Sequence, residues 1–195
     1  MKNREDRRIR KTRKILKDTL VEKLQQQRLS DISVKSLCEA ADINRSTFYL
    51  HYNNVHALWN SVENEIIESM NSILESFEAD IIISKPLPLL LEVTEFLERE
   101  TLFNKKLFNT VEASSLLEKI KKSFIDYFLK NCSGMIKTNH MAELNLYITF
   151  VISGSVSLFY SWFLEKIDIS MNQLAHIIEN IITKGVDDYL ALISS

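Results

Sequence analysis

The spacing of apolar positions along the chain predicts helices almost throughout. In residues 1–28 the apolar side chains recur every three to four positions, which is the period of an amphipathic helix. A second stripe of this kind follows Ser33, a residue type that often caps helices, and Asn44 offers a cap for a third, short helix. The pattern therefore predicts three helices, with the turn Asp42–Asn44 between the last two.

A longer apolar pattern runs from about Val55 to Ala79 and predicts a fourth helix. Pro86 and Pro88 then mark a break, because proline removes a backbone donor and disfavours a helical residue before it. A capping box of Ser170 and Gln173 opens the last helix. Two further helices are predicted over 86–101 and 104–131, the second with an interruption near 110–115. Another long helix is predicted before Ser170.

Composition agrees with an all-α fold. Three glycines and two prolines in 195 residues are too few for the many turns that sheets need. The hydrophobic fraction of 46% is ordinary for a folded soluble protein. Cys38 and Cys132 show no paired spacing and no secretory signal precedes them, so we expect a protein of the reducing cytoplasm.

Charge is divided unevenly along the chain. Residues 1–60 hold 13 Lys and Arg against 7 Asp and Glu, a local charge of +6. The remaining residues hold 24 − 13 = 11 basic and 26 − 7 = 19 acidic side chains, a local charge of −8. A basic front on an acidic remainder indicates that the first part meets a polyanion.

The predicted third helix lies in the polar segment INRSTFYLHY. At 100° per residue Arg45, Ser46 and Tyr49 share one side, while Phe48 turns to another and can anchor the helix. Arginine donates two parallel hydrogen bonds to guanine, hydroxyl groups bond to phosphates or bases, and the methyl group of Thr47 suits thymine. The pattern favours a helix-turn-helix that reads the major groove, although a solvated face of an ordinary helical bundle has the same pattern.

The run LCEAADINRSTFYLHYNNVHAL resembles the DNA-binding signature of the TetR/AcrR family of bacterial transcriptional regulators. A second run, GSVSLFYSWFLE from Gly154 to Glu165, is similar to a Gly and Trp pattern in a branch that includes regulators of the dihydroxyacetone kinase type. The residues that carry the first resemblance are Leu37, Ala41, Ile43, Arg45, Thr47, Phe48, Tyr49, His51, Tyr52 and Leu58.

The resemblance implies a DNA-binding domain over residues 1–54 and a regulatory, dimer-forming domain over 55–195, linked by the helix at 55–79. It implies a cytoplasmic repressor under effector control, without a cofactor. Together with Asn44 at the start of the third helix, the residues expected to contact DNA are Ser33, Lys35, Arg45, Ser46, Thr47, Tyr49 and His51.

Three positions depart from the family pattern. Cys38 replaces a small alanine, which is a tolerable change in packing. Asp42 replaces the turn glycine, and aspartate tolerates the left-handed backbone better than most residues do. Val55 stands where a lysine commonly contacts phosphate, and His56 can replace that contact only in part.

The last two helices each carry a long face of apolar or small residues. These faces exceed what one domain needs to cover, so we expect them to pair with a second copy as a four-helix dimer interface. Such a dimer favours a palindromic operator. Aromatic residues before and within these helices are either plain core or the lining of a pocket for an apolar effector; the candidates are Phe103, Phe108, Phe124, Tyr127, Phe128, Tyr147 and Phe150.

Other functions receive less support from the sequence. Residues 144–164 lack charge and are long enough to span a membrane, but a stripe of small polar residues and the missing basic flanks favour a buried soluble helix. A helical adaptor that binds only proteins is a further alternative. The four histidines lack ligand-like spacing, and no nucleophile–base arrangement or phosphate-binding glycine loop is present, so we expect neither a metal site nor an enzyme.

Overall fold

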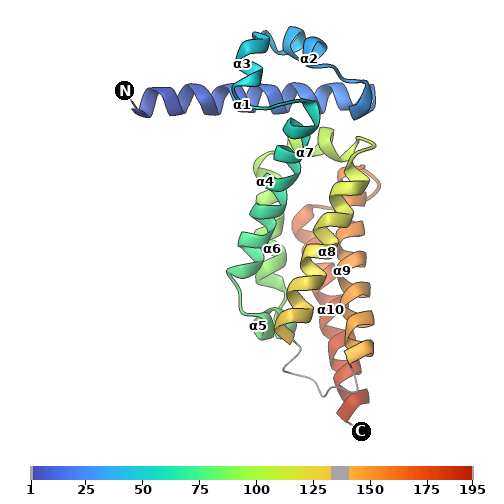
Figure 1. The fold of residues 1–195 in the computed structure, drawn as a ribbon. Coiled ribbons are helices and arrows are strands. Elements are labelled where there is room, and N and C mark those ends of the chain that lie inside the picture. Colours follow the sequence, from blue (N-terminus) through green and yellow to red (C-terminus); the bar gives the residue numbers. More distant parts are fainter. Residues whose placement is uncertain (1, 133–140, 195) are drawn as a thin grey trace. The chain divides into compact units, whose positions relative to one another are not determined.

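The structure is a computed structural model. It describes the backbone of residues 2–132 and 141–194, and side chains within 7–131, except Asp80, and within 141–185. This part of the chain is built from helices without strands, so the all-α prediction is confirmed. The elements in Figure 1 are α1 Lys2–Leu24, η1 Leu29–Asp31, α2 Val34–Ala41, α3 Arg45–Tyr49, α4 Val55–Glu75, α5 Ala79–Ser84, α6 Leu87–Arg99, α7 Thr101–Phe108, α8 Ala113–Cys132, α9 Met141–Phe163 and α10 Met171–Ser194.

One predicted helix ends early. The fourth helix was expected to reach Ala79, but α4 ends at Glu75 and Ala79 begins a separate short helix, α5. The amide groups of Ser76 and Phe77 bond to carbonyls three residues earlier, which tightens the chain into a turn. Further along, Pro86 lies just before α6, so the predicted break at the prolines is confirmed.

The chain divides into two compact units, and unit 1 contains residues 1–66 together with 102–116. Within unit 1, α2 packs against α1 and α3. The segment 102–116 adds fully buried side chains of its own, Leu107 and Leu116. The expected DNA-binding domain, residues 1–54, lies wholly inside this unit, and its boundary stays a prediction. The other fully buried residues include Leu16, Leu20, Leu37, Phe48 and Leu58.

Unit 2 contains residues 67–101 and 117–195. In it α10 packs against α5, α6 and α9. The predicted capping box is confirmed at the start of α10, where the Ser170 amide donates to Gln173 Oε1 over 3.0 Å and the Gln173 amide donates to Ser170 Oγ over 3.1 Å. This box fixes the first turn of the last helix.

Among the described helices, α9 is the one that is long and apolar enough to cross a membrane. One side of α9 is buried within unit 2 through Leu144, Ile148 and Ile152, and α9 packs against α10. Core helices of soluble proteins meet the same criterion of length and composition. The composition of α9 is therefore weak evidence for a membrane span.

Candidate nucleic-acid interface

The turn between α2 and α3 depends on Asp42. This residue caps the C-terminus of α2 in the left-handed region, with φ 52° and ψ 47°. Its amide and that of Ile43 both donate to the Cys38 carbonyl, which satisfies an acceptor at the helix end. The prediction that aspartate maintains this turn in place of glycine is confirmed.

Phe48 anchors α3 in the core of unit 1. Its side chain is fully buried, and its ring lies 5.6 Å from the ring of Tyr49 and 6.0 Å from that of Tyr52, centroid to centroid. The opposite side of α3 is open to solvent: Arg45 and Ser46 are exposed, and Tyr49 is 56% exposed. Phe48 thus anchors α3 in the core while Arg45 and Ser46 stay exposed to solvent.

The other expected contact residues lie around α3 in different settings. Ser33 caps α2 by accepting a hydrogen bond from the Ser36 amide over 3.1 Å. Lys35 is exposed, with its Nζ 4.0 Å from a Glu39 carboxylate oxygen. Asn44 is exposed at the N-cap of α3, and Thr47 is half-buried. A shallow depression brings several of these residues together; it is lined by Lys35, Cys38, Glu39, Asp42, Ile43, Asn44 and Arg45.

His51 follows α3 and is half-buried. Burial lowers the pKa of His51 below its usual 6.5, and the positive charge of Arg13 lowers it further. Both causes favour the neutral form of the imidazole. The effect indicates that Arg13 of α1 lies in the neighbourhood of His51. Burial raises the pKa of the Cys38 thiol, Arg45 opposes that change and Glu39 adds to it.

The start of α4 explains one departure from the family pattern. Val55, which replaces a lysine that commonly binds phosphate, is buried in unit 1 and so serves packing. The neighbouring His56 is exposed. Asn54 caps α4 by accepting a hydrogen bond from the Ala57 amide over 2.8 Å. This end of α4 therefore presents the His56 imidazole to solvent, where the family pattern has the ammonium group of a lysine.

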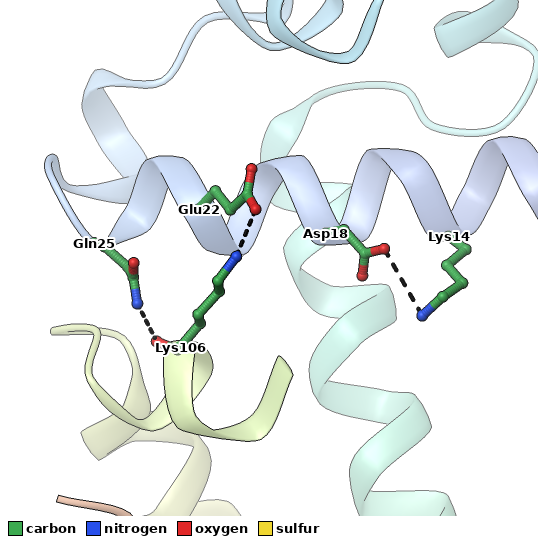
Figure 2. Close-up of polar contacts among 5 residues, drawn as sticks. All are labelled: Lys14, Asp18, Glu22, Gln25 and Lys106. Atoms are coloured by element: carbon green, nitrogen blue, oxygen red, sulfur yellow. Dashed lines mark hydrogen bonds and ion pairs between the residues drawn. The ribbon is translucent and has the colours of Figure 1, made fainter. Parts of the chain in front are cut away.

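Sequence reasoning missed a polar connection between the end of α1 and the segment 102–116 (Figure 2). Lys106 Nζ lies 2.6 Å from a Glu22 carboxylate oxygen, and Gln25 Nε2 donates to the Lys106 carbonyl over 3.3 Å. Next to it the Leu29 amide donates to Glu112 Oε1 over 2.9 Å, which ties η1 to the same segment. The partners in these pairs are more than 80 residues apart in sequence, so no local pattern could have predicted the contacts.

The aromatic residues proposed for an effector pocket do not form one group. Phe103 and Phe108 belong to unit 1, and Phe108 is buried there. In unit 2 a half-buried set, Phe124, Tyr127 and Phe128, packs against the buried cluster of Ala79, Leu144, Ile148 and Ile152. Tyr147 Oη donates to the Ile182 carbonyl over 3.2 Å, while Phe150 is 73% exposed. The role of these seven residues in binding stays a prediction.

Comparison with known proteins decides the family. The TetR C-terminal family model, described as "Transcriptional regulator C-terminal region", matches residues 84–184, just over half of the chain. The protein belongs to the TetR family of transcriptional regulators. Members of the TetR family bind DNA as dimers, and many respond to small molecules. A search among curated proteins gave no match.

Solved structures share the TetR-family fold with this chain. A putative TetR-family regulator from Syntrophomonas wolfei has a TM-score of 0.63 at 10% identity, over 91% of this chain and 95% of its own. The fatty acid degradation regulator FadR from Bacillus halodurans has a TM-score of 0.59 at 13% identity, over 88% and 94%. The dihydroxyacetone kinase operon activator DhaS has a TM-score of 0.57 at 15% identity, over 90% and 96%. Such low identities establish the fold, and the branch within the family stays a prediction.

Proposed function

We propose that this TetR-family protein is a cytoplasmic repressor that binds a palindromic operator as a homodimer. The observation that carries the proposal is the solvent-exposed side of α3, where Arg45, Ser46 and Tyr49 project from a helix anchored by Phe48. Arg45 would donate to a guanine edge and Ser46 to a base or phosphate, with Tyr49 on the phosphate backbone. Ser33 and Lys35 would fix the position of α2 on the neighbouring phosphates.

The exposed apolar face of α9 and α10 supports a dimer. Leu146 is 72% exposed and Phe150 is 73% exposed on α9, and Ile177 and Ile181 are exposed on α10. Gly154 also lies on the outer side of α9, where an added Cβ atom would meet nothing within 4 Å in the single chain. Small residues permit close helix approach, and apolar side chains lose exposed surface on pairing. A four-helix interface between two copies would use both properties.

Control by an effector is the second half of the proposal. Within unit 2, Ser123 on α8 donates to Asn71 on α4 over 2.7 Å, and Tyr127 Oη donates to the Phe77 carbonyl just after α4 over 3.0 Å. An apolar ligand among Phe124, Tyr127 and Phe128 would disturb these bonds and shift α4. Because α4 is continuous from Val55, its shift would move the two reading helices of a dimer out of register with successive grooves.

Selection of bound fragments from the source genome's DNA tests the proposal, followed by titration of the selected duplex. We expect Arg45→Ala to weaken binding about 10- to 100-fold, because a bidentate arginine–guanine contact contributes about 1–3 kcal/mol. Arg99→Ala is the matched control, since Arg99 is an exposed arginine in unit 2. A protein that selects no duplex, or an Arg45→Ala variant that binds like Arg99→Ala, would contradict DNA reading by α3 and favour the protein-only adaptor.

The direction of regulation needs its own measurement, because DhaS is an operon activator. Transcription from the selected operator, with and without the protein, separates repression from activation. An increase in transcription would contradict the repressor part of the proposal and leave DNA binding intact.

A further inference from the structure

Leu50, at the end of α3, is a large apolar side chain that the fold leaves in solvent. It is 82% exposed, although the neighbouring Phe48 is fully buried. Leu50 is the C-cap of α3 and keeps a helical backbone, with φ −69° and ψ −19°. Its amide donates to the Ser46 carbonyl over 3.2 Å, so the helical turn continues through this residue. Leu50 therefore has little part in the core of unit 1.

The helical period places Leu50 on the side of α3 that carries the proposed DNA contacts. Leu50 follows Ser46 by four residues, which is a rotation of only about 40° around the helix axis. Phe48, two residues before Leu50, points about 160° away from it. Within about 140° of the helix surface the exposed side chains are, in order, Arg45, Tyr49, Ser46 and Leu50. An apolar side chain thus completes an otherwise polar surface.

Exposure alone does not single out Leu50, because isolated apolar side chains are common on protein surfaces. Leu102, in the same compact unit, is 78% exposed. The neighbours make the difference, since Leu50 lies beside hydrogen-bonding side chains that suit bases and phosphates. A duplex that covers Arg45 and Ser46 would bring base edges to Leu50 as well.

The major groove offers a leucine one well-matched base. Thymine carries a C5-methyl group there, whereas the groove edges of guanine and adenine present polar atoms. Contact with leucine removes water from such polar atoms without replacing their hydrogen bonds, which is unfavourable. Contact between leucine and a methyl group removes apolar surface from water, which is favourable. The sequence pointed to Thr47 for this methyl group, but Thr47 is half-buried, and Leu50 is far more open to solvent.

We propose that Leu50 is a specificity-determining residue that packs on the C5-methyl group of one thymine in each half-site of the operator. Leu50 follows Arg45 by five residues, about 7.5 Å along the helix axis, which corresponds to about two base-pair steps. The thymine should therefore lie within about three base pairs of the guanine contacted by Arg45. This role rests on the proposed function, because it adds one base to those that α3 would read.

Replacement of thymine by uracil tests the contact, because uracil lacks the C5-methyl group and keeps the same base pairing. Each thymine in one half-site of the selected operator is replaced in turn, and each duplex is titrated with the full-length protein. At one thymine the wild type should lose about 4-fold in affinity, the amount expected for one buried methyl group. Leu50→Ala should bind the thymine duplex more weakly and should no longer distinguish thymine from uracil at that position.

Leu102→Ala is the matched control, since it truncates an equally exposed leucine of unit 1 that lies outside α3. It should keep the wild-type affinity and the preference for thymine, and thermal melting should show that both variants fold. If no single thymine matters to the wild type, or if Leu50→Ala keeps the preference for thymine, the role of Leu50 is overturned and the proposed function survives. If the wild type selects no duplex, both proposals fall.

Discussion

Two exposed surfaces of this protein differ in what their side chains disclose. On α3 the apolar residue Phe48 is turned inward and the polar residues face solvent, whereas α9 keeps Phe150, a large apolar side chain, on the outside. The donors and charges of a polar surface indicate the kind of partner that it binds. An apolar surface indicates only that something covers it. The partner of α9 and α10 therefore has to be identified by disrupting their apolar surface. The partner of α3 can be identified by replacing its polar side chains.

The largest expected effect comes from the apolar surface. Phe150→Glu places a charge on the proposed interface and should convert the dimer to a monomer. Operator affinity should then fall by about 100-fold or more, because the second half-site no longer gains from the first. Sedimentation and operator titration measure both effects. Leu102→Glu, at a 78% exposed leucine in unit 1, is the control and should leave a dimer. A dimeric Phe150→Glu protein would refute this interface.

A smaller effect is expected where the segment 102–116 supports η1, the short helix that precedes α2. Glu112→Ala removes the acceptor of the Leu29 amide and should lower the free energy of unfolding by about 1 kcal/mol. Glu112→Gln keeps an acceptor oxygen and should lower it less. Chemical denaturation followed by fluorescence measures both. Equal stability of wild type and Glu112→Ala would mean that this bond contributes nothing to unit 1.

The turn before α3 offers a stabilising change. Because Asp42 has a positive φ, Asp42→Gly should raise the free energy of unfolding by up to about 1 kcal/mol, and Asp42→Ala should lower it. Thermal melting of the three proteins gives the order. If alanine proves more stable than glycine, backbone strain is not what selects the residue at this turn.

The smallest effect concerns pH and acts in opposite senses on folding and binding. Since the folded pKa of His51 lies below 6.5, His51 contributes stability that is present above pH 6.5 and is lost as pH falls through the folded pKa. A bound phosphate favours the charged imidazole instead. Between about pH 7.5 and about pH 6, wild-type operator affinity should therefore rise relative to His51→Gln. Parallel pH profiles for the two proteins would exclude a phosphate contact by His51.

The sequence predicted those features that depend on neighbouring residues. The α2–α3 turn and the Ser170–Gln173 capping box follow from turn chemistry and helical period within a few positions. The short helix α5 was missed, because an apolar run before two prolines resembles a helix end as much as a new helix. The sequence also grouped Phe150 with the aromatic residues of a core or pocket, since aromatic character does not indicate which side of a helix faces solvent.

Long-range features lay beyond sequence reasoning. Glu22 and Lys106 are 84 residues apart, and nothing near either residue indicates the other. The assignment of 102–116 to the first compact unit depends on such pairs and on the burial of Leu107 and Leu116. Only the folded chain brings these groups together.

Unit 1 is assembled from two separate stretches of the chain, and this limits how its specificity can be transplanted. A hybrid regulator that takes residues 1–66 from a relative would set Lys106 of the recipient against a foreign side chain at position 22. Exchanging 102–116 along with the front segment would restore matched neighbours. Evolution of a new operator preference by recombination faces the same requirement, whereas point changes on α3 do not.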